Sequence, residues 1–228
     1  MASEQSIDVK EAYYPLFFRL AGKLCVVVGG GRVAERKARA LIAAGARVRL
    51  ISPTSTSGLS GLHRQGKIEL LAREYREGDL EGASLVFAAT DKGEVNSQVR
   101  EDARRSAIPL NAADSPDMGD FIVPAVIRRG PILIAISTSG LLPLLSRKLR
   151  AEITKSLTPD YAAYARRVGV FRRYLLQNVE NGRLRKEIMK RVSRAAMREV
   201  SRMTLGEMKK RFMAPLEVKD PAPIDEKA

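Results

Sequence analysis

Apolar residues in the first half of the chain gather in short runs, and longer amphipathic stretches separate these runs. The run Leu24–Val28 holds five apolar residues, three of them valine, which is typical of a strand buried on both faces. Residues 33–44 carry apolar side chains at helical spacing, with basic residues opposite. Strands that alternate with helices across short connections predict an open parallel sheet with helices on both faces. We expect strands at 24–28, 47–52, 68–71, 84–90 and 108–113, and helices at 33–44, 58–62 and 95–106.

The pattern changes after residue 113. Two apolar segments, 121–127 and 131–137, flank a basic turn and predict a hairpin outside the sheet, followed by a helix over 143–156. One hairpin and one helix are too small to bury a core alone, so we expect this piece to pair with a second copy of the chain. The expected regions are a parallel-sheet domain at 1–113, a small α+β dimerisation segment at 114–156, a basic helical domain at 157–214 and a disordered tail at 215–228.

A glycine-rich turn follows the first strand. Gly29, Gly31 and Ala34 occupy the marked places of the pattern G-x-G-x-x-A. In that pattern the first glycine makes a tight turn, the second lets the backbone approach a pyrophosphate, and the third small residue lets the helix pack against the strand. A glycine turn without a ligand is the plain alternative, but the strand before it and the helix after it favour dinucleotide binding. The fold class is therefore α/β, with an N-terminal sheet of the Rossmann type.

The end of the second strand departs from the common NAD-binding pattern. An Asp or Glu usually stands there to hold the adenosine ribose, whereas this chain has Ser52, Pro53 and Thr54. Three interpretations follow: Thr54 and backbone groups hold the ribose, the cofactor carries a phosphate near Arg32 and Arg36, or no dinucleotide binds. We favour NAD.

The formal net charge of +14 implies an anionic partner. Residues 151–214 hold 16 Lys and Arg against 6 Asp and Glu, and so contribute +10 of that charge. Few aromatic residues interleave with the basic ones and no familiar nucleic-acid motif is present, so we expect no nucleic-acid partner. No apolar run approaches the ~20 residues of a membrane span and no signal peptide is evident, which predicts a cytoplasmic protein without membrane contact. Cys25 is the single cysteine, and His63, the single histidine, lies in a polar stretch.

Five motifs now follow one another in order along residues 13–156. They closely resemble the precorrin-2 dehydrogenase family, which includes the N-terminal part of sirohaem synthase. The motifs are Val-Gly-Gly-Gly-Arg-Val-Ala-Glu-Arg-Lys (28–37), Ala-Ala-Thr-Asp (88–91) with Val95-Asn96, Asn-Ala-Ala-Asp (111–114), Asp-Phe-Ile-Val-Pro-Ala (120–125) and Ala-Ile-Ser-Thr-Ser-Gly (135–140).

The resemblance implies NAD-dependent oxidation of precorrin-2 to sirohydrochlorin by a homodimer, with insertion of iron or cobalt in some members. It implies that Asp114 is the acid-base group, and it favours NAD because the family tolerates the missing acid on the second strand. The substrate would be a tetrapyrrole polycarboxylate, which suits the basic charge. The cofactor-binding residues predicted from the turn and the resemblance are Gly29, Gly30, Gly31, Arg32, Val33, Ala34, Pro53, Thr54, Thr90, Asp91 and Asn111.

One position departs from the family pattern, because Leu142 stands before Pro143 where the family has a small polar residue. A non-catalytic NAD-sensing regulatory module is the alternative function. Asn111 and Asp114 argue against it, because they follow the fifth strand at the sheet edge where ligands bind, and a sensor needs no carboxylate there. No histidine pair or carboxylate cluster predicts a dedicated metal site, so the sequence leaves chelation open.

Overall fold

The structure is a computed structural model that describes residues 13–113 and 118–214. The predicted catalytic Asp114 and the tail predicted at 215–228 lie outside the described residues. The chain divides into two compact units. The first unit holds the described residues up to Val123 together with 139–141, and the second holds 124–138 and the residues from Leu142 onward. The two units are coarser than the four predicted regions, so the boundaries predicted at 113, 156 and 214 stay predictions.

The first unit contains a parallel sheet of five strands in the order β3-β2-β1-β4-β5. The chain therefore adds strands on one side of β1 and then crosses to the other side, so that β1 and β4 flank the point where the strand order reverses. Open α/β sheets bind their ligands at the carboxyl ends of the strands at such a point. The strands are β1 (Leu24–Val28), β2 (Arg47–Ile51), β3 (Glu69–Leu71), β4 (Ala83–Ala88) and β5 (Leu110–Ala112).

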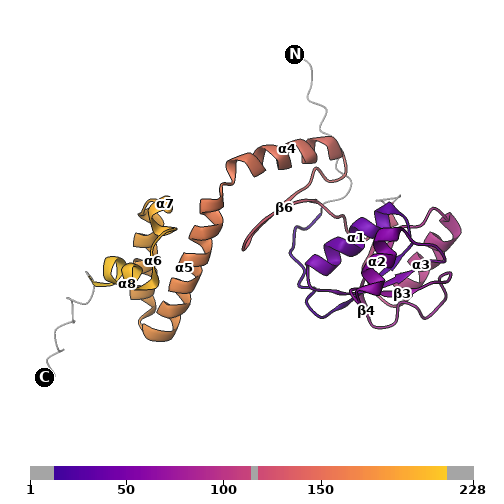
Figure 1. Cartoon of the computed structure of the whole chain (residues 1–228), viewed down its shortest axis with the longest axis horizontal. Helices are drawn as coiled ribbons and strands as arrows, with labels where there is room; N and C mark the ends of the chain where they lie inside the picture. The colour runs from indigo at the N-terminus through magenta and orange to yellow at the C-terminus, as the bar shows by residue number, and fades with distance from the viewer. Residues whose placement is uncertain (1–12, 114–117, 215–228) are drawn as a thin grey trace, which may run out of the picture. The chain divides into compact units, whose positions relative to one another are not determined.

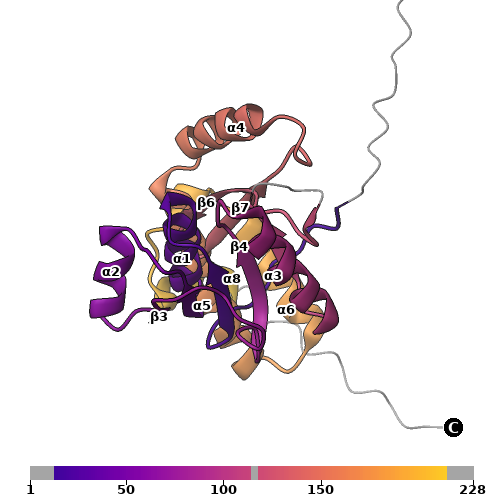
Figure 2. The same ribbon diagram turned by 90° about the vertical axis from the view of Figure 1, so that its right-hand side faces the viewer.

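Helices cover both faces of this sheet (Figure 2). Helices α1 (Arg32–Ala43) and α2 (Ser57–Arg64) pack on the face that receives Cys25 and Val27, and α3 (Gly93–Arg105) packs on the opposite face. All residues from Cys25 to Val28 are at most 2% exposed. The unbroken apolar run of β1 is therefore needed, because both of its faces are buried.

The second unit consists of a hairpin and helices (Figure 1). Strands β6 (Ala125–Arg129) and β7 (Ile132–Ile136) pair antiparallel, and α4 (Pro143–Ser156) packs on the hairpin. The last four helices share a core that includes the fully buried Phe171 and Val192. They are α5 (Pro159–Asn178), α6 (Gly182–Arg194), α7 (Met197–Val200) and α8 (Leu205–Phe212). No helix in the described parts of the chain is long and apolar enough to cross a membrane.

The α/β class with a helical C-terminal part is confirmed, and the main difference lies at the start of the hairpin. We expected its first strand from residue 121, but β6 begins at Ala125. The reason is that Phe121 packs in the core of the first unit, where its ring meets the ring of Phe87 edge-on at 5.6 Å between centroids. The apolar run 121–127 thus crosses the boundary between the two units. Phe121 packs in the core of the first unit, whereas the residues from Ala125 onward form β6 of the second.

Candidate functional site

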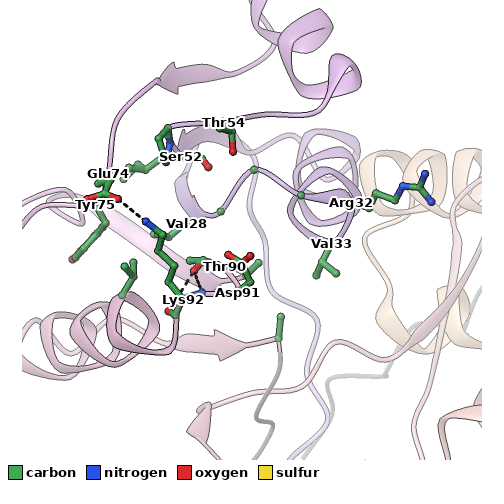
Figure 3. Close-up of a pocket in the computed structure, with 18 residues that line it drawn as sticks. Val28, Arg32, Val33, Ser52, Thr54, Glu74, Tyr75, Thr90, Asp91 and Lys92 are labelled. Atoms are coloured by element: carbon green, nitrogen blue, oxygen red, sulfur yellow. Dashed lines mark hydrogen bonds and ion pairs between the residues drawn. The ribbon is translucent and has the colours of Figure 1, made fainter.

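A cavity of about 520 Å³ opens at the carboxyl ends of β1, β2 and β4 (Figure 3). Every residue that lines it belongs to the first unit. The lining residues are Val28, Gly29, Gly30, Gly31, Arg32, Val33, Ile51, Ser52, Pro53, Thr54, Glu74, Tyr75, Ala89, Thr90, Asp91, Lys92, Val95 and Ala113. Most of the predicted cofactor-binding residues are therefore brought together in one cavity.

The three glycines of the turn have different surroundings. Gly29 has a φ of 125°, and a Cβ there would lie 2.3 Å from the carbonyl oxygen of Ala89. A Cβ on Gly30 would lie 1.8 Å from the carbonyl oxygen of Thr54, so the segment after β2 crosses directly over this residue. A Cβ on Gly31 would meet nothing within 4 Å. Gly29 and Gly30 are thus required by the protein itself, whereas the space beside Gly31 is open to a ligand.

Helix α1 begins beside this open space. Its N-cap is Gly31, which has no side chain to cap the helix, so the first backbone N–H groups lack an intrahelical partner. The positive end of the helix dipole adds to their attraction for an anion. A phosphate group fits this position in charge and in hydrogen-bonding capacity.

Glu35 lies in the first turn of α1, but other protein groups engage its carboxylate, so it does not take the place of a phosphate at the free backbone N–H groups. Its carboxylate accepts a hydrogen bond of 2.5 Å from the Thr56 hydroxyl and pairs with Arg39. The Thr56 bond and then the Arg39 bonds lower the pKa of this carboxyl group. Thr56 also donates its backbone N–H to the carbonyl of Gly30 at 3.0 Å. These contacts fix the segment after β2 against the glycine turn, and the sequence pattern gives no sign of them.

The side of the cavity near β2 carries an acid that the sequence interpretation missed. Ser52 is buried, while Pro53 and Thr54 are exposed at the cavity. Glu74 reaches the same cavity from the loop after β3 and forms an ion pair of 2.6 Å with Lys92, which follows β4 (Figure 3). The hydrogen bond between them lowers the pKa of Glu74 and raises that of Lys92. Both side chains are more than half exposed, so the pair is weak and a ligand can replace it.

Tyr75 lines the cavity beside Glu74. It is 7% exposed, and its hydroxyl donates a 2.7 Å hydrogen bond to Asp102. Burial raises the pKa of this phenol, with the Asp102 bond as the second cause. Tyr75 is therefore a neutral, fixed wall of the cavity.

Thr90 and Asp91 lie at the cavity on the loop after β4, as the resemblance implies. The Thr90 hydroxyl accepts the backbone N–H of Lys92 at 2.7 Å, and its carbonyl accepts from the Asn96 amide at 3.0 Å. These bonds hold the loop in a turn that leads into α3. The loop is thereby a fixed edge of the cavity.

Two predicted cofactor-binding residues do not line the cavity. Ala34 is fully buried under the turn, which suits the close packing expected of it. Asn111 is 6% exposed, and its side-chain amide bonds to Lys37 and to the carbonyl of Phe121. Ala113 does line the cavity and is the last described residue before Asp114.

No group of three or more His, Cys, Asp or Glu side chains suited to a metal ion occurs among residues 13–113 and 118–214. His63 directs its Nδ1 to the carbonyl of Ile68 at 3.2 Å, outside the cavity. Cys25 is buried in β1, and this burial raises the pKa of its thiol to about 11. It therefore acts as a small core residue.

Comparison with known proteins gives similarities of sequence and of fold. Residues 16–125 match the family described as "Putative NAD(P)-binding". Siroheme synthase from Azotobacter vinelandii is 41% identical over 165 residues, which are 72% of this chain and 35% of that protein. Siroheme synthase from Methylococcus capsulatus is 38% identical over 179 residues, 78% of this chain and 38% of that protein. The chain thus spans little more than a third of these relatives.

A solved structure titled "SirC, precorrin-2 dehydrogenase" superimposes with a TM-score of 0.73. The match covers 88% of this chain and 98% of that one at 22% identity, so it is a likeness of fold. Together with the sequence matches, it confirms the resemblance drawn from the motifs. The chain is thus similar in sequence to siroheme synthases and in fold to a precorrin-2 dehydrogenase.

Proposed function

We propose that this chain binds NAD in the cavity of the first unit and oxidises precorrin-2 to sirohydrochlorin. The observation that carries the proposal is the open space beside Gly31 at the start of α1, bounded by a turn that only glycine can form at position 29. The resemblance to siroheme synthases and to a precorrin-2 dehydrogenase supplies the reaction and the substrate. NAD supplies the hydride acceptor when it is bound.

The residues that line the cavity offer a place for each part of NAD. The pyrophosphate would lie at the N-terminus of α1, and the adenosine would lie toward Thr54 and Glu74. Glu74 offers the ribose hydroxyls the acid that the end of β2 lacks, whereas an added 2′-phosphate would lie next to this carboxylate. In Figure 3 the Arg32 side chain points away from Thr54, so it gives such a phosphate no support there. The nicotinamide would lie toward Ala113, at the end of β5.

Asp114 is the group that we propose for proton transfer. When the substrate gives up a hydride it becomes electron-poor, and a proton must then leave the macrocycle. A carboxylate one residue beyond Ala113 can take that proton. The plain alternative is that Asp114 caps the turn formed with Ser115 and Pro116.

The experiment that tests the function is the reduction of NAD on addition of precorrin-2, followed by absorbance. An NAD-sensing module would bind the cofactor but show no reduction. Sirohydrochlorin with ferrous or cobalt ion, tested separately, decides whether the protein also chelates metal. We place the protein in the cytoplasm, without a membrane or nucleic-acid partner, as the sequence predicts.

We further propose that the protein is a homodimer joined through roughly residues 114–156. Support comes from the apolar side chains that the second unit leaves in water. Val126 on β6 is 42% exposed, and Leu142, Leu144 and Leu145 at the start of α4 are 49%, 68% and 39% exposed. A second copy of this segment would cover them.

The substitution Gly31→Glu is expected to weaken NAD binding by about 100-fold or more while the protein stays folded. The added side chain enters open space, so the fold tolerates it, but it fills the place of the pyrophosphate and repels it. Calorimetry measures the affinity, and Gly61→Glu on α2, which also enters open space, is the control. Normal NAD affinity in a folded Gly31→Glu protein would remove the glycine turn from the binding site.

The substitution Asp114→Asn is expected to leave folding, dimerisation and NAD affinity intact and to slow dehydrogenation by roughly 100-fold or more. Asparagine keeps the oxygen that a turn needs but loses the basicity. Steady-state turnover of precorrin-2 measures the effect. Near-normal turnover would leave Asp114 as a turn residue and move the proton transfer elsewhere.

The substitution Leu144→Glu is expected to convert the dimer to a monomer, because it places a charge in the buried interface. Sedimentation at micromolar concentration measures the change. Leu176→Glu on α5, at a leucine that is 52% exposed, is the matched control and should stay dimeric. A wild-type protein that sediments as a compact monomer would contradict the dimer itself.

A further inference from the structure

Lys37 is a partly buried amine that the proposed reaction does not use directly. It stands in the second turn of α1, and its ammonium group donates a 2.9 Å hydrogen bond to Asn111 Oδ1 on β5. The same group lies 5.4 Å from the centre of the Phe87 ring on β4. A lysine side chain usually extends into water, whereas this one points inward across the sheet.

The Asn111 amide also forms a hydrogen bond to the part of the chain that follows the sheet. Its Nδ2 donates to the carbonyl oxygen of Phe121 at 2.8 Å. Next to it, Asp120 and Leu110 exchange two bonds of 2.8 Å each, one of them through the Asp120 carboxylate. We call Lys37, Asn111 and Phe121 the clasp, because they join α1 and β5 to the far end of the segment that begins after β5. Asp114 belongs to that segment in the sequence.

The clasp has an energetic cost. Burial and, to a smaller extent, the neighbouring Arg36 on α1 together lower the pKa of Lys37 from 10.5 to about 8. The groups that Lys37 contacts on β4 and β5 are Phe87 and Asn111, neither of which titrates. The carboxylate of Asp120 is bonded to the Leu110 backbone. A methionine would fill the same space without that cost but would leave Asn111 Oδ1 without this donor, so packing alone does not account for a lysine.

We propose that Lys37 is a positioning residue for the dehydrogenation, which fixes Asn111 and thereby the end of β5 that leads to Ala113 at the cavity. This inference rests on the proposed function. It gives Asn111 a role behind the cavity, since both ends of its amide are engaged within the protein. The charged donor matters because a charge-assisted hydrogen bond is roughly twice as strong as a neutral one.

The first test compares Lys37→Met, which keeps the shape but removes the charge, with Lys37→Arg, which keeps the charge and donor. We expect Lys37→Met to retain NAD affinity within about twofold and to lose about 10-fold to 100-fold in kcat, as small misplacements of reacting groups do. Lys37→Arg should recover part of that loss. Lys67→Met is the control, because it removes one exposed lysine of the same unit and should leave kcat unchanged.

The second test follows pH between about 7 and 9.5 and separates positioning from mere stability. Because the folded state lowers the pKa of Lys37, it releases this proton at a lower pH than the unfolded chain does. The contribution of Lys37 to stability therefore rises with pH above about 8. The charged bond to Asn111 weakens over the same range, so wild-type kcat should fall relative to Lys37→Arg while wild-type stability rises relative to that variant. A merely structural lysine would make kcat follow stability.

The outcomes are distinct. An inactive wild-type protein would overturn the proposed function and this inference with it. An active wild type together with an equally active Lys37→Met would overturn the role of Lys37 alone. If Lys37→Met does not fold, the comparison of wild type with Lys37→Arg decides, and parallel pH profiles of kcat for the two would refute the proposal.

Discussion

The site depends on the close approach of three backbone segments at Gly29 and Gly30. The carbonyl oxygens of Ala89 and Thr54 occupy the places where side chains would stand. This contact draws the ends of β1, β2 and β4 together and leaves Gly31 and the first turn of α1 open on the other side. A side chain at 29 or 30 would push those strand ends apart. The cavity exists because the protein's own backbone fills the space beside Gly29 and Gly30, whereas the space beside Gly31 stays open.

Local patterns were sufficient to predict the sheet. The apolar runs and the helical spacing between them reflect burial on two faces, and this constraint acts within each short segment. The glycine pattern likewise reflects a local turn. The roles of residues whose partners lie far away in the sequence could not be predicted from local patterns. Gly30 is fixed by Thr54, which lies 24 positions on, Glu74 meets Lys92 at a separation of 18, and Lys37 meets Asn111 at a separation of 74.

The absent acid at the end of β2 shows how such a contact changes an interpretation. The sequence rule places the ribose-binding acid on that strand, and Ser52 and Thr54 do not satisfy it. The cavity nevertheless holds a carboxylate, because the loop after the neighbouring β3 brings Glu74 to the same place. The rule describes a requirement of the ligand, and more than one strand of the sheet is close enough to meet it.

The charge of the second unit calls for a similar argument. Its helices bury an apolar core of their own, and most of the basic residues lie on the surface around it. Among residues 151–214, 16 basic side chains face 6 acidic ones, and self-repulsion of this size weakens a small domain. A fold that needed only solubility would carry far less charge of one sign. The excess is explained if a polyanionic ligand neutralises it on binding, as the proposed tetrapyrrole polycarboxylate would.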